Sequence, residues 1–395
     1  MKKGWQTKTL GEICDIERGG SPRPIQDFIT TDPNGINWIK IGDATASGKY
    51  IYKTEEKIKP EGVKRSRMVY EGDFILSNSM SFGRPYIMKT TGCIHDGWLV
   101  LHQPKVDPDY LYHALSSDLV FDQFDRLAAG STVRNLNIGL AKSVEIPYPP
   151  LAEQQRIVGI LDEAFEGIAI ATANAEQNLQ NARALFESHL QSVFTQRGPA
   201  WVERSLVSLC AHFFDSAHRT PKYQEEGIPA LRPRDVVNGQ LNFADAACVS
   251  EEEYEVQSKR YKPAPGDIVY SRELSYGWAA LLPGKPRVCL SQGMCVFRPN
   301  REVDSAFLLY VLNGPTVREQ AMRVAVGAAH PHINLGDIKS YSIPLPSFDE
   351  QRQIAHKFDS LHEETQRLAS IYQQKLAALD ELKKSLLHQA FTGQL

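Results

Sequence analysis

The sequence lacks the features that mark several large classes of protein. Its 395 residues include only 6 cysteines, with no C-x-x-C pair and no companion histidine at metal-ligand spacing, which predicts reduced and mostly buried thiols. No run approaches the roughly 20 apolar residues that a membrane span needs. The N-terminal segment Met-Lys-Lys-Gly-Trp-Gln-Thr-Lys lacks the apolar core of a secretory signal. We therefore expect a cytoplasmic protein with no membrane partner.

An excess of one charge is also lacking. The 44 Lys and Arg residues stand against 47 Asp and Glu residues, which gives a net charge of -3, so charge alone does not name a partner. Hydrophobic residues make up 42% and charged residues 23% of the chain, as in an ordinary globular protein of two or three domains. If the chain binds nucleic acid, its positive charges must be gathered on particular faces.

The chain contains an internal repeat, which covers nearly its whole length. From Asn137 onward the sequence recurs without a gap at an offset of 197 residues, and upstream the similarity is weaker and needs small gaps. Each copy has a globular part followed by a tail. Matching positions include Asn137 and Asn334, Gln154 and Gln351, Gly72-Asp73 and Gly266-Asp267, and Phe82-Gly83 and Tyr276-Gly277.

Both tails have the apolar spacing of long amphipathic helices. Apolar residues recur every three or four positions over more than five turns, without a proline break. Ser347, followed by Glu350 three residues later, predicts a capping box at the start of the second helix. The residues expected to pair the helices are Ile157, Leu161, Ile168, Leu179, Phe186 and Leu190 in the first, and Ile354, Phe358, Leu361, Leu368, Leu376, Leu379 and Leu386 in the second.

Length and connectivity predict how the two helices pair. A helix of about 44 residues spans about 66 Å. A domain of about 150 residues is only about 38 Å across, so most of the apolar face of each helix must pack on the other helix. The second globular part lies between the two helices, and only antiparallel pairing keeps its ends close. The prediction is a rod with a domain at each end and a pseudo-two-fold axis, a symmetry that suits a DNA duplex.

The fold class that follows is α+β, with two tandem α/β globular domains separated by two long helices that pair as an antiparallel coiled coil. The predicted boundaries are 1–150 for the first globular domain, 151–198 for the first helix, 199–347 for the second domain and 348–395 for the second helix.

Motifs that carry catalysis are absent. The sequence has no phosphate-binding G-x-x-x-x-G-K-[ST], no G-x-G-x-x-G, no G-x-S-x-G, no H-E-x-x-H and no N-P-P-[YF]. The H-x-H pair His330 and His332 could hold a metal, but no third ligand is near in sequence and the first copy has Val133-Arg134-Asn135 there. We expect neither a metal site nor catalysis in this chain.

Polar clusters recur at one place in both globular parts. Basic residues precede the Gly-Asp strand, and loops rich in groups that bond bases or phosphates follow it. A basic cluster is ordinarily a solvated face, but its recurrence in a duplicated fold favours a DNA interface. Neither domain is basic overall, so we expect weak binding without a partner. The candidate DNA-binding residues are Lys64, Arg65, Arg67, Asn78, Ser79, Arg84, Ser131, Thr132 and Arg134 in the first copy, and Lys259, Arg260, Lys262, Arg272, Glu273, His330 and His332 in the second.

Several of these segments resemble a known family. The run Glu153-Gln154-Gln155-Arg156-Ile157 after Ile146-Pro147-Tyr148-Pro149, its second copy from Ile343, and the ending Leu386-Leu387-His388-Gln389-Ala390-Phe391 closely resemble the DNA-specificity subunit of type I restriction-modification systems. Gly35-Ile36-Asn37-Trp38 and Gly72-Asp73-Phe74-Ile75 look like that family's target recognition domains. The resemblance covers essentially the whole chain.

The resemblance implies a function and a set of partners. Each globular domain would read one half of a bipartite, asymmetric site in double-stranded DNA, and the helices would set the spacing. Two methyltransferase subunits would gather on the helices, at positions flanking the pairing residues, and restriction subunits would add cleavage. S-adenosylmethionine and ATP would bind only to those partners, and the present chain would hold no cofactor.

Two other classes remain open. A non-catalytic interaction scaffold with two globular heads would show no salt-dependent affinity for DNA, whereas a DNA-specificity subunit should show a steep negative salt slope. A duplicated enzyme should carry one acid-base constellation in both copies. His95-Asp96 has either Leu290-Ser291 or Ser291-Gln292 as its counterpart, so that pair is not duplicated.

Overall fold

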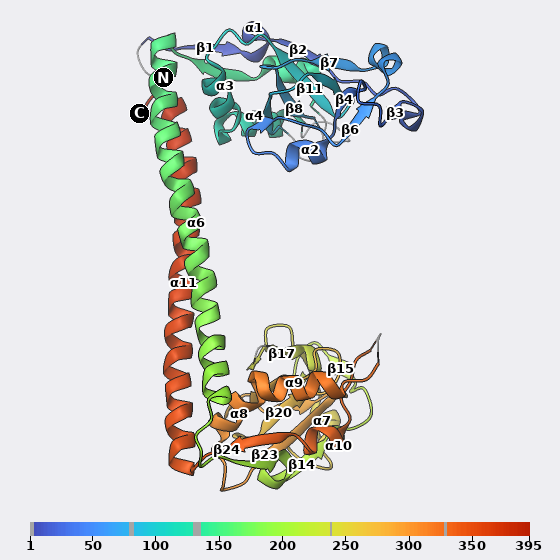
Figure 1. Cartoon of the computed structure of the whole chain (residues 1–395), viewed down its shortest axis with the longest axis vertical. Helices are drawn as coiled ribbons and strands as arrows, with labels where there is room; N and C mark the ends of the chain where they lie inside the picture. The colour runs from blue at the N-terminus through green and yellow to red at the C-terminus, as the bar shows by residue number, and fades with distance from the viewer. Residues whose placement is uncertain (1–3, 79–82, 129–135, 238, 328–329) are drawn as a thin grey trace. The chain divides into compact units, whose positions relative to one another are not determined.

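The chain forms two compact units in a computed structural model that describes residues 4–78, 83–128, 136–237, 239–327 and 330–395. The first unit comprises Met1–Ala175 and Gln374–Leu395, and the second comprises Glu176–Gln373. The two predicted long helices are present as α6 (Leu151–Thr195) and α11 (Phe348–Thr392), each 45 residues long. Each unit thus holds one globular domain and one part of each long helix (Figure 1).

The globular domain of the first unit is built on two five-stranded sheets. Their strand orders are β2-β11-β8-β9-β5 and β3-β6-β4-β10-β7, and β1 pairs separately with β12. The strands are β1 (Gln6–Thr9), β2 (Asp15–Arg18), β3 (Ile29–Thr30), β4 (Ile36–Ile39), β5 (Tyr50–Ile51), β6 (Glu56–Ile58), β7 (Arg67–Val69), β8 (Phe74–Ser77), β9 (Pro85–Met88), β10 (Gly92–Ile94), β11 (Trp98–His102) and β12 (Glu145–Tyr148). The helices are α1 (Leu10–Ile13), α2 (Ile41–Thr45), α3 (Pro108–Leu115), α4 (Asp118–Ala128) and α5 (Ile138–Ser143), with short 3-10 turns η1 (Ile25–Asp27) and η2 (Pro60–Arg65).

The domain of the second unit repeats this arrangement with two four-stranded sheets. Its strand orders are β14-β23-β20-β21 and β15-β19-β16-β22, with the separate pairs β13-β24 and β17-β18. The strands are β13 (Val202–Ser205), β14 (Cys210–Asp215), β15 (Tyr223–Gln224), β16 (Ile228–Leu231), β17 (Val236–Val237), β18 (Gln240–Leu241), β19 (Ala247–Val249), β20 (Ile268–Ser271), β21 (Ala279–Leu281), β22 (Cys289–Leu290), β23 (Met294–Pro299) and β24 (Ser342–Leu345). The helices are α7 (Glu251–Gln257), α8 (Ser305–Asn313), α9 (Pro315–Val324) and α10 (Leu335–Lys339), with turns η3 (Leu206–Leu209) and η4 (Pro233–Asp235).

Each domain has three layers, because its central sheet is buried on both faces. In β8, Phe74 and Leu76 join the cluster packed against the helices, while Ile75 between them joins the cluster facing the other sheet. Alternation of side chains along a strand produces this division. In β20, Ile268 and Val269 divide in the same way.

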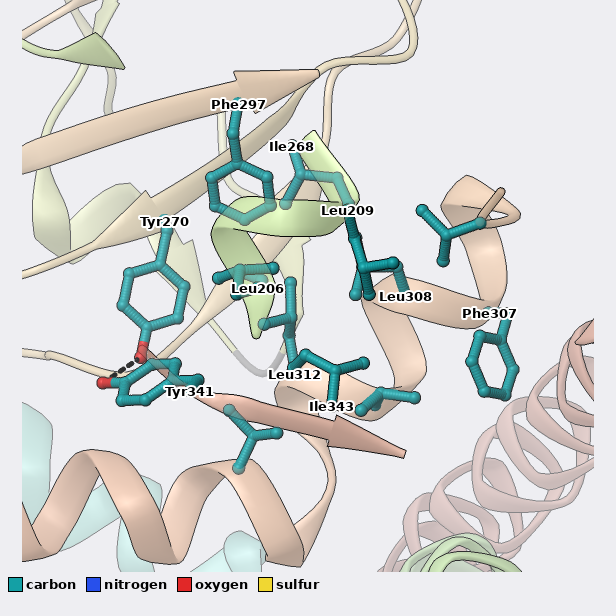
Figure 2. Close-up of a cluster of buried hydrophobic side chains, with 14 of the residues drawn as sticks. Leu206, Leu209, Ile268, Tyr270, Phe297, Phe307, Leu308, Leu312, Tyr341 and Ile343 are labelled. Atoms are coloured by element: carbon teal, nitrogen blue, oxygen red, sulfur yellow. Dashed lines mark hydrogen bonds between the residues drawn. The ribbon is translucent and has the colours of Figure 1, made fainter. Parts of the chain in front are cut away.

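The helix-facing core of the second unit is mainly apolar (Figure 2). Leu206, Leu308 and Ile343 reach it from three different elements, and all are fully buried. The hydroxyls of Tyr270 and Tyr341 meet inside it at 3.2 Å, so each of these buried polar groups has a partner. Burial raises the pKa of Tyr341 to about 12, so both rings stay neutral.

The long helices run antiparallel in each unit, as predicted. In the first unit, Ile157 and Leu161 pack in one cluster with Leu387 and Phe391, so an early part of α6 meets a late part of α11. In the second unit, Phe186 contacts Phe358 with ring centroids 6.1 Å apart. The late part of α6 therefore meets the early part of α11.

The predicted pairing residues are buried to different extents. Ile157, Leu161, Leu190 and Phe358 are buried. The remaining nine are half-buried: Ile168, Leu179, Phe186, Ile354, Leu361, Leu368, Leu376, Leu379 and Leu386. Ala182, Ala355, Thr365 and Ala390 are buried on the same helices. Small residues therefore contribute to these interfaces. The apolar spacing of the first helix includes Ala182, whereas that of the second helix did not identify Ala355, Thr365 or Ala390.

Glutamine side chains join each long helix to its domain. Gln154 accepts a hydrogen bond from the Asp107 backbone N–H at 2.8 Å and donates to the Pro149 carbonyl at 2.9 Å. Its repeat partner Gln351 accepts from the Asp304 N–H at 2.8 Å. Asp107 and Asp304 in turn cap α3 and α8 with their side chains. The matching glutamines of the repeat therefore have a structural role at the helix junction.

One hydrogen bond of the predicted capping box at Ser347 is present. The hydroxyl of Ser347 accepts from the Glu350 backbone N–H at 3.4 Å. The Glu350 carboxylate accepts from the indole nitrogen of Trp201 at 2.9 Å, which ties the helix to the start of the second domain. All six cysteines are free thiols in the described part of the chain, and four of them are buried.

Candidate nucleic-acid interface

The loops after β8 and β20 begin with the same backbone frame. Asn78 donates its N–H to the Gly97 carbonyl at 3.0 Å, and Arg272 donates to the Gly293 carbonyl at 2.8 Å. Gly83 and Gly277 close the two loops with positive φ angles of 72° and 84°, a conformation that glycine adopts without strain. Asn78 and Arg272 are therefore structurally equivalent, and they are the first positions at which the two loops differ.

Both of these side chains bond inward. The Asn78 amide donates to the Asp96 carbonyl at 2.9 Å, and its side chain is buried. Arg272 forms an ion pair with Asp215 and donates to the Ile333 carbonyl at 3.2 Å. These contacts assign both residues a role in holding the loops, and their predicted contacts with bases stay a prediction.

A basic surface surrounds Asp96 in the first unit. Its carboxylate accepts from the Ser21 hydroxyl at 2.7 Å and from Arg23 at 3.2 Å, and its carbonyl accepts from Arg18 at 3.2 Å. The Ser21 hydrogen bond lowers the pKa of Asp96, and Arg23 lowers it further, so the carboxylate stays charged. The Arg23 side chain is 80% exposed, so it can contact an anion from solvent as well as Asp96.

The predicted basic cluster of this unit lies on the neighbouring surface. Lys64, Arg65 and Arg67 are all exposed. Arg67 contacts Glu17 at 3.1 Å and reaches the Arg18 carbonyl at 3.5 Å, so it adjoins the surface around Asp96. Sequence reasoning missed Arg18 and Arg23, although each copy carries an arginine-containing polar run directly after β2 or β14.

Arg84 is exposed at the end of the loop after β8, with its guanidinium 5.5 Å from the centre of the Tyr86 ring. Four other predicted residues, Ser79, Ser131, Thr132 and Arg134, lie outside the described residues.

In the second unit, three segments meet beside Arg272. Glu273 and His332 form an isolated antiparallel bridge, and Val326 forms another with His332. The Ile333 N–H donates to the Arg272 carbonyl at 2.9 Å. The structure therefore brings His332 to Arg272 and Glu273, from which it is far apart in sequence. His330 is exposed at the edge of this group.

The basic cluster before β20 is exposed as well. Lys259, Arg260 and Lys262 are all exposed, and Lys262 is paired with Glu255 at 2.7 Å. Arg260 lines a small cavity of about 20 Å³ together with Asp215, the carboxylate that holds Arg272. Asp215 is therefore near arginines from both sides of β20 in the chain: it pairs with Arg272, which follows the strand, and lines the same cavity as Arg260, which precedes it.

Strand pairing settles the counterpart of His95-Asp96. Ile94 pairs with Ile39, and Leu290 pairs with Leu231 at the equivalent position, so His95-Asp96 corresponds to Ser291-Gln292. An acid-base pair is therefore not repeated. Within the described ranges, no group of three or more His, Cys, Asp or Glu side chains is arranged to hold a metal ion. Over those ranges, none of the helices is both long and apolar enough to span a bilayer.

Comparison with known proteins gives consistent matches over the whole chain. The family model of the type I restriction modification DNA specificity domain matches twice, at residues 2–181 and 201–374. The specificity subunit of the type I restriction enzyme EcoBI of Escherichia coli is 22% identical over 428 residues, covering 99% of this chain and 86% of the relative. The putative MjaX specificity subunit of Methanocaldococcus jannaschii is 24% identical and covers 100% and 94%.

Solved structures resemble this chain at the level of the fold. A structure concerned with assembly and conformational transition of the type I R-M system gives a TM-score of 0.79 at 21% identity, covering 100% of this chain and 99% of the other. The HsdS subunit from Thermoanaerobacter tengcongensis gives 0.63 at 19% identity, with coverage of 100% and 98%. The predicted fold class is thereby confirmed.

Proposed function

The chain belongs to the family of type I restriction-modification DNA specificity proteins, and from this premise we propose that each of its globular domains reads one half of a bipartite, asymmetric DNA site. The domains concerned are those of residues 1–150 and 199–347. The chain contributes sequence recognition, and it carries no catalytic step of its own.

One observation carries this proposal: the two domains share their framework and differ in their loops. Gln154 and Gln351 make matching backbone contacts, whereas the loops that begin at the equivalent positions Asn78 and Arg272 differ in sequence. A shared frame gives both domains one way to approach the duplex. Different loops present different groups to the bases, so the two half-sites should differ in sequence.

The basic surface of the first unit would supply phosphate contacts. Arg23, Lys64 and Arg65 are exposed, and Arg23 contacts Asp96 beside the loop frame. Such contacts position a protein on the duplex without reading sequence, and they make the affinity depend on salt. The second unit offers Lys259 and Arg260 for the same purpose.

Partner subunits complete the activity. We assign methylation to methyltransferase subunits, two for each chain, docked on exposed positions of α6 and α11. Restriction subunits would add cleavage. S-adenosylmethionine and ATP belong to those partners, and the present chain binds neither.

The test is adenine methylation across the host genome, measured by single-molecule sequencing with and without this gene. Loss of one bipartite, asymmetric motif on deletion is the expected result, and it gives the target sequence directly. If cells that express the chain with active methyltransferase subunits lose no motif, the function is wrong and a protein-interaction scaffold becomes the better explanation.

The helices would set the distance between the half-sites. Insertion of four residues near Ala171 in α6, with a matching insertion in the facing part of α11, should change the spacer length and leave both half-site sequences intact. Unaltered spacing with retained methylation would refute this role.

A further inference from the structure

Leu274 has an unusual backbone and an unusual exposure. Its φ angle is 57°, in the left-handed region that a leucine rarely occupies. The residue is 59% exposed, and it is flanked by the polar residues Glu273 and Ser275. Strain of this kind persists only where the surroundings impose it, and it is found preferentially at functional positions.

Neighbouring segments hold this conformation on both sides. The Leu274 N–H donates to the Pro331 carbonyl at 3.1 Å, and the next residue, Ser275, donates its hydroxyl to the Pro233 carbonyl at 2.8 Å. The preceding residue, Glu273, is bridged to His332. The loop is therefore fixed at both sides of Leu274, and its apolar side chain is presented to solvent from a rigid base.

The first copy carries an apolar residue at the same position. Asn78 and Arg272 are equivalent by their backbone hydrogen bonds, so Met80, two residues later, corresponds to Leu274. Met80 lies outside the described residues. The loops have diverged at their first two positions, yet a large apolar residue stands at the third position of both.

We propose that Leu274 is an apolar wedge that enters a base step of the second DNA half-site. This inference rests on the proposed function. Leucine and methionine are among the side chains that proteins insert between bases, partly unstacking them. A rigid base suits such a wedge, because the loop need not be ordered when DNA binds. Glu273 and His330 beside it are polar and fit the rim of such a contact.

The experiment uses the full chain in complex with its methyltransferase subunits and a duplex carrying its target site. The base analogue 2-aminopurine, whose fluorescence rises on unstacking, is placed in turn at each step of the second half-site. Three variants are compared with the parent: Leu274→Met, which restores the residue of the first copy; Leu274→Asn, which suits the left-handed backbone; and Val202→Ala, a control at a side chain that is 53% exposed on β13.

We expect the parent, Leu274→Met and Val202→Ala to raise the fluorescence at one base step and to bind alike. Leu274→Asn should raise none and bind about tenfold more weakly, the loss expected for one apolar contact. Its salt slope should equal that of the parent, because no phosphate contact is removed. Asparagine relieves the backbone strain, so an equal or higher melting temperature would show that the weaker binding does not come from unfolding.

Two results separate failure of this inference from failure of the proposed function. If the parent complex does not prefer its bipartite site over unrelated DNA, the proposed function itself is wrong. If the parent binds specifically but unstacks no step of the second half-site, or if Leu274→Asn binds and unstacks as the parent does, the wedge is overturned.

Discussion

Replacement of Gln351 by methionine tests the junction between the second domain and α11. The side chain is 1% exposed and makes three hydrogen bonds: it accepts from the Asp304 N–H at 2.8 Å and donates to the Glu302 carbonyl at 3.1 Å and the Pro346 carbonyl at 3.0 Å. Methionine has a similar volume and makes none of these bonds. The change therefore removes polar partners with little change in packing.

The cost follows from the groups left behind. A buried backbone group that loses its partner costs about 1 to 3 kcal/mol. A carbonyl can find another donor more easily than an N–H can find another acceptor, so the unpaired Asp304 amide should account for most of the cost. We expect Gln351→Met to destabilise the second unit by about 3 to 5 kcal/mol. Gln154→Met removes two such bonds in the first unit and should cost about 2 to 4 kcal/mol there.

The assay must resolve the two units, because a chain of this kind need not unfold in one step. The rate of hydrogen exchange at the Asp304 amide reports how firmly the junction is held. Urea unfolding, followed by hydrogen exchange of the amides of α8, reports the free energy of unfolding of the second unit. The matched control is Gln353→Met, two residues away and exposed, which should change stability by less than about 0.5 kcal/mol. If Gln351→Met keeps slow exchange at Asp304 and unfolds at the same urea concentration as the parent, the glutamine does not hold this junction.

Three further perturbations probe other parts of the chain. Phe358→Ala should destabilise the second unit by about 3 to 5 kcal/mol in urea unfolding, because the ring is 1% exposed and packs on Phe194 and Tyr310. Burial lowers the pKa of His113 below its usual 6.5, despite the hydrogen bond to Asp162, so the stability it contributes is present above about pH 6.5 and falls as the pH falls below it. His113→Tyr, which copies Tyr310 of the second unit, should flatten that pH dependence in unfolding curves between pH 5 and 7. Arg23→Ala should weaken DNA binding and make the slope of log affinity against log salt shallower by about 0.9, as measured by titration at several salt concentrations.

The sequence was sufficient to predict the long helices and their antiparallel pairing, because periodicity and chain connectivity restrict the alternatives strongly. It did not reveal the hydrogen bonds that glutamine side chains make with backbone groups. Gln123 exchanges two hydrogen bonds with the backbone of Glu145, and Gln320 does the same with Ser342. These pairs keep the offset of 197 residues, so extending the ungapped repeat upstream of Asn137 would have matched the two glutamines, although not shown what they bond to.

The candidate interface was predictable only in part, for a physical reason. Exposed residues such as Lys64 could be recognised by residue type and position in the sequence, because their exposure does not depend on a partner distant in sequence. The inward turn of Arg272 depends on Asp215, which lies 57 residues away, and neither periodicity nor local composition carries that pairing. The strain at Leu274 likewise arises from hydrogen bonds to segments distant in sequence.

The contacts that repeat between the two units share a property that bears on how such a chain could change its target. Gln154, Gln351, Gln123 and Gln320 bond to backbone groups, which every residue possesses. The frame of the loops after β8 and β20 is also made of backbone hydrogen bonds. A frame that depends on backbone groups tolerates replacement of the loop side chains, whereas the buried pair of Arg272 and Asp215 must change together, since loss of one partner leaves the other charge unpaired. Variation in the target should therefore proceed most easily through the exposed positions of each loop, whereas a change at the inward-facing position at its start requires a matching change in its partner.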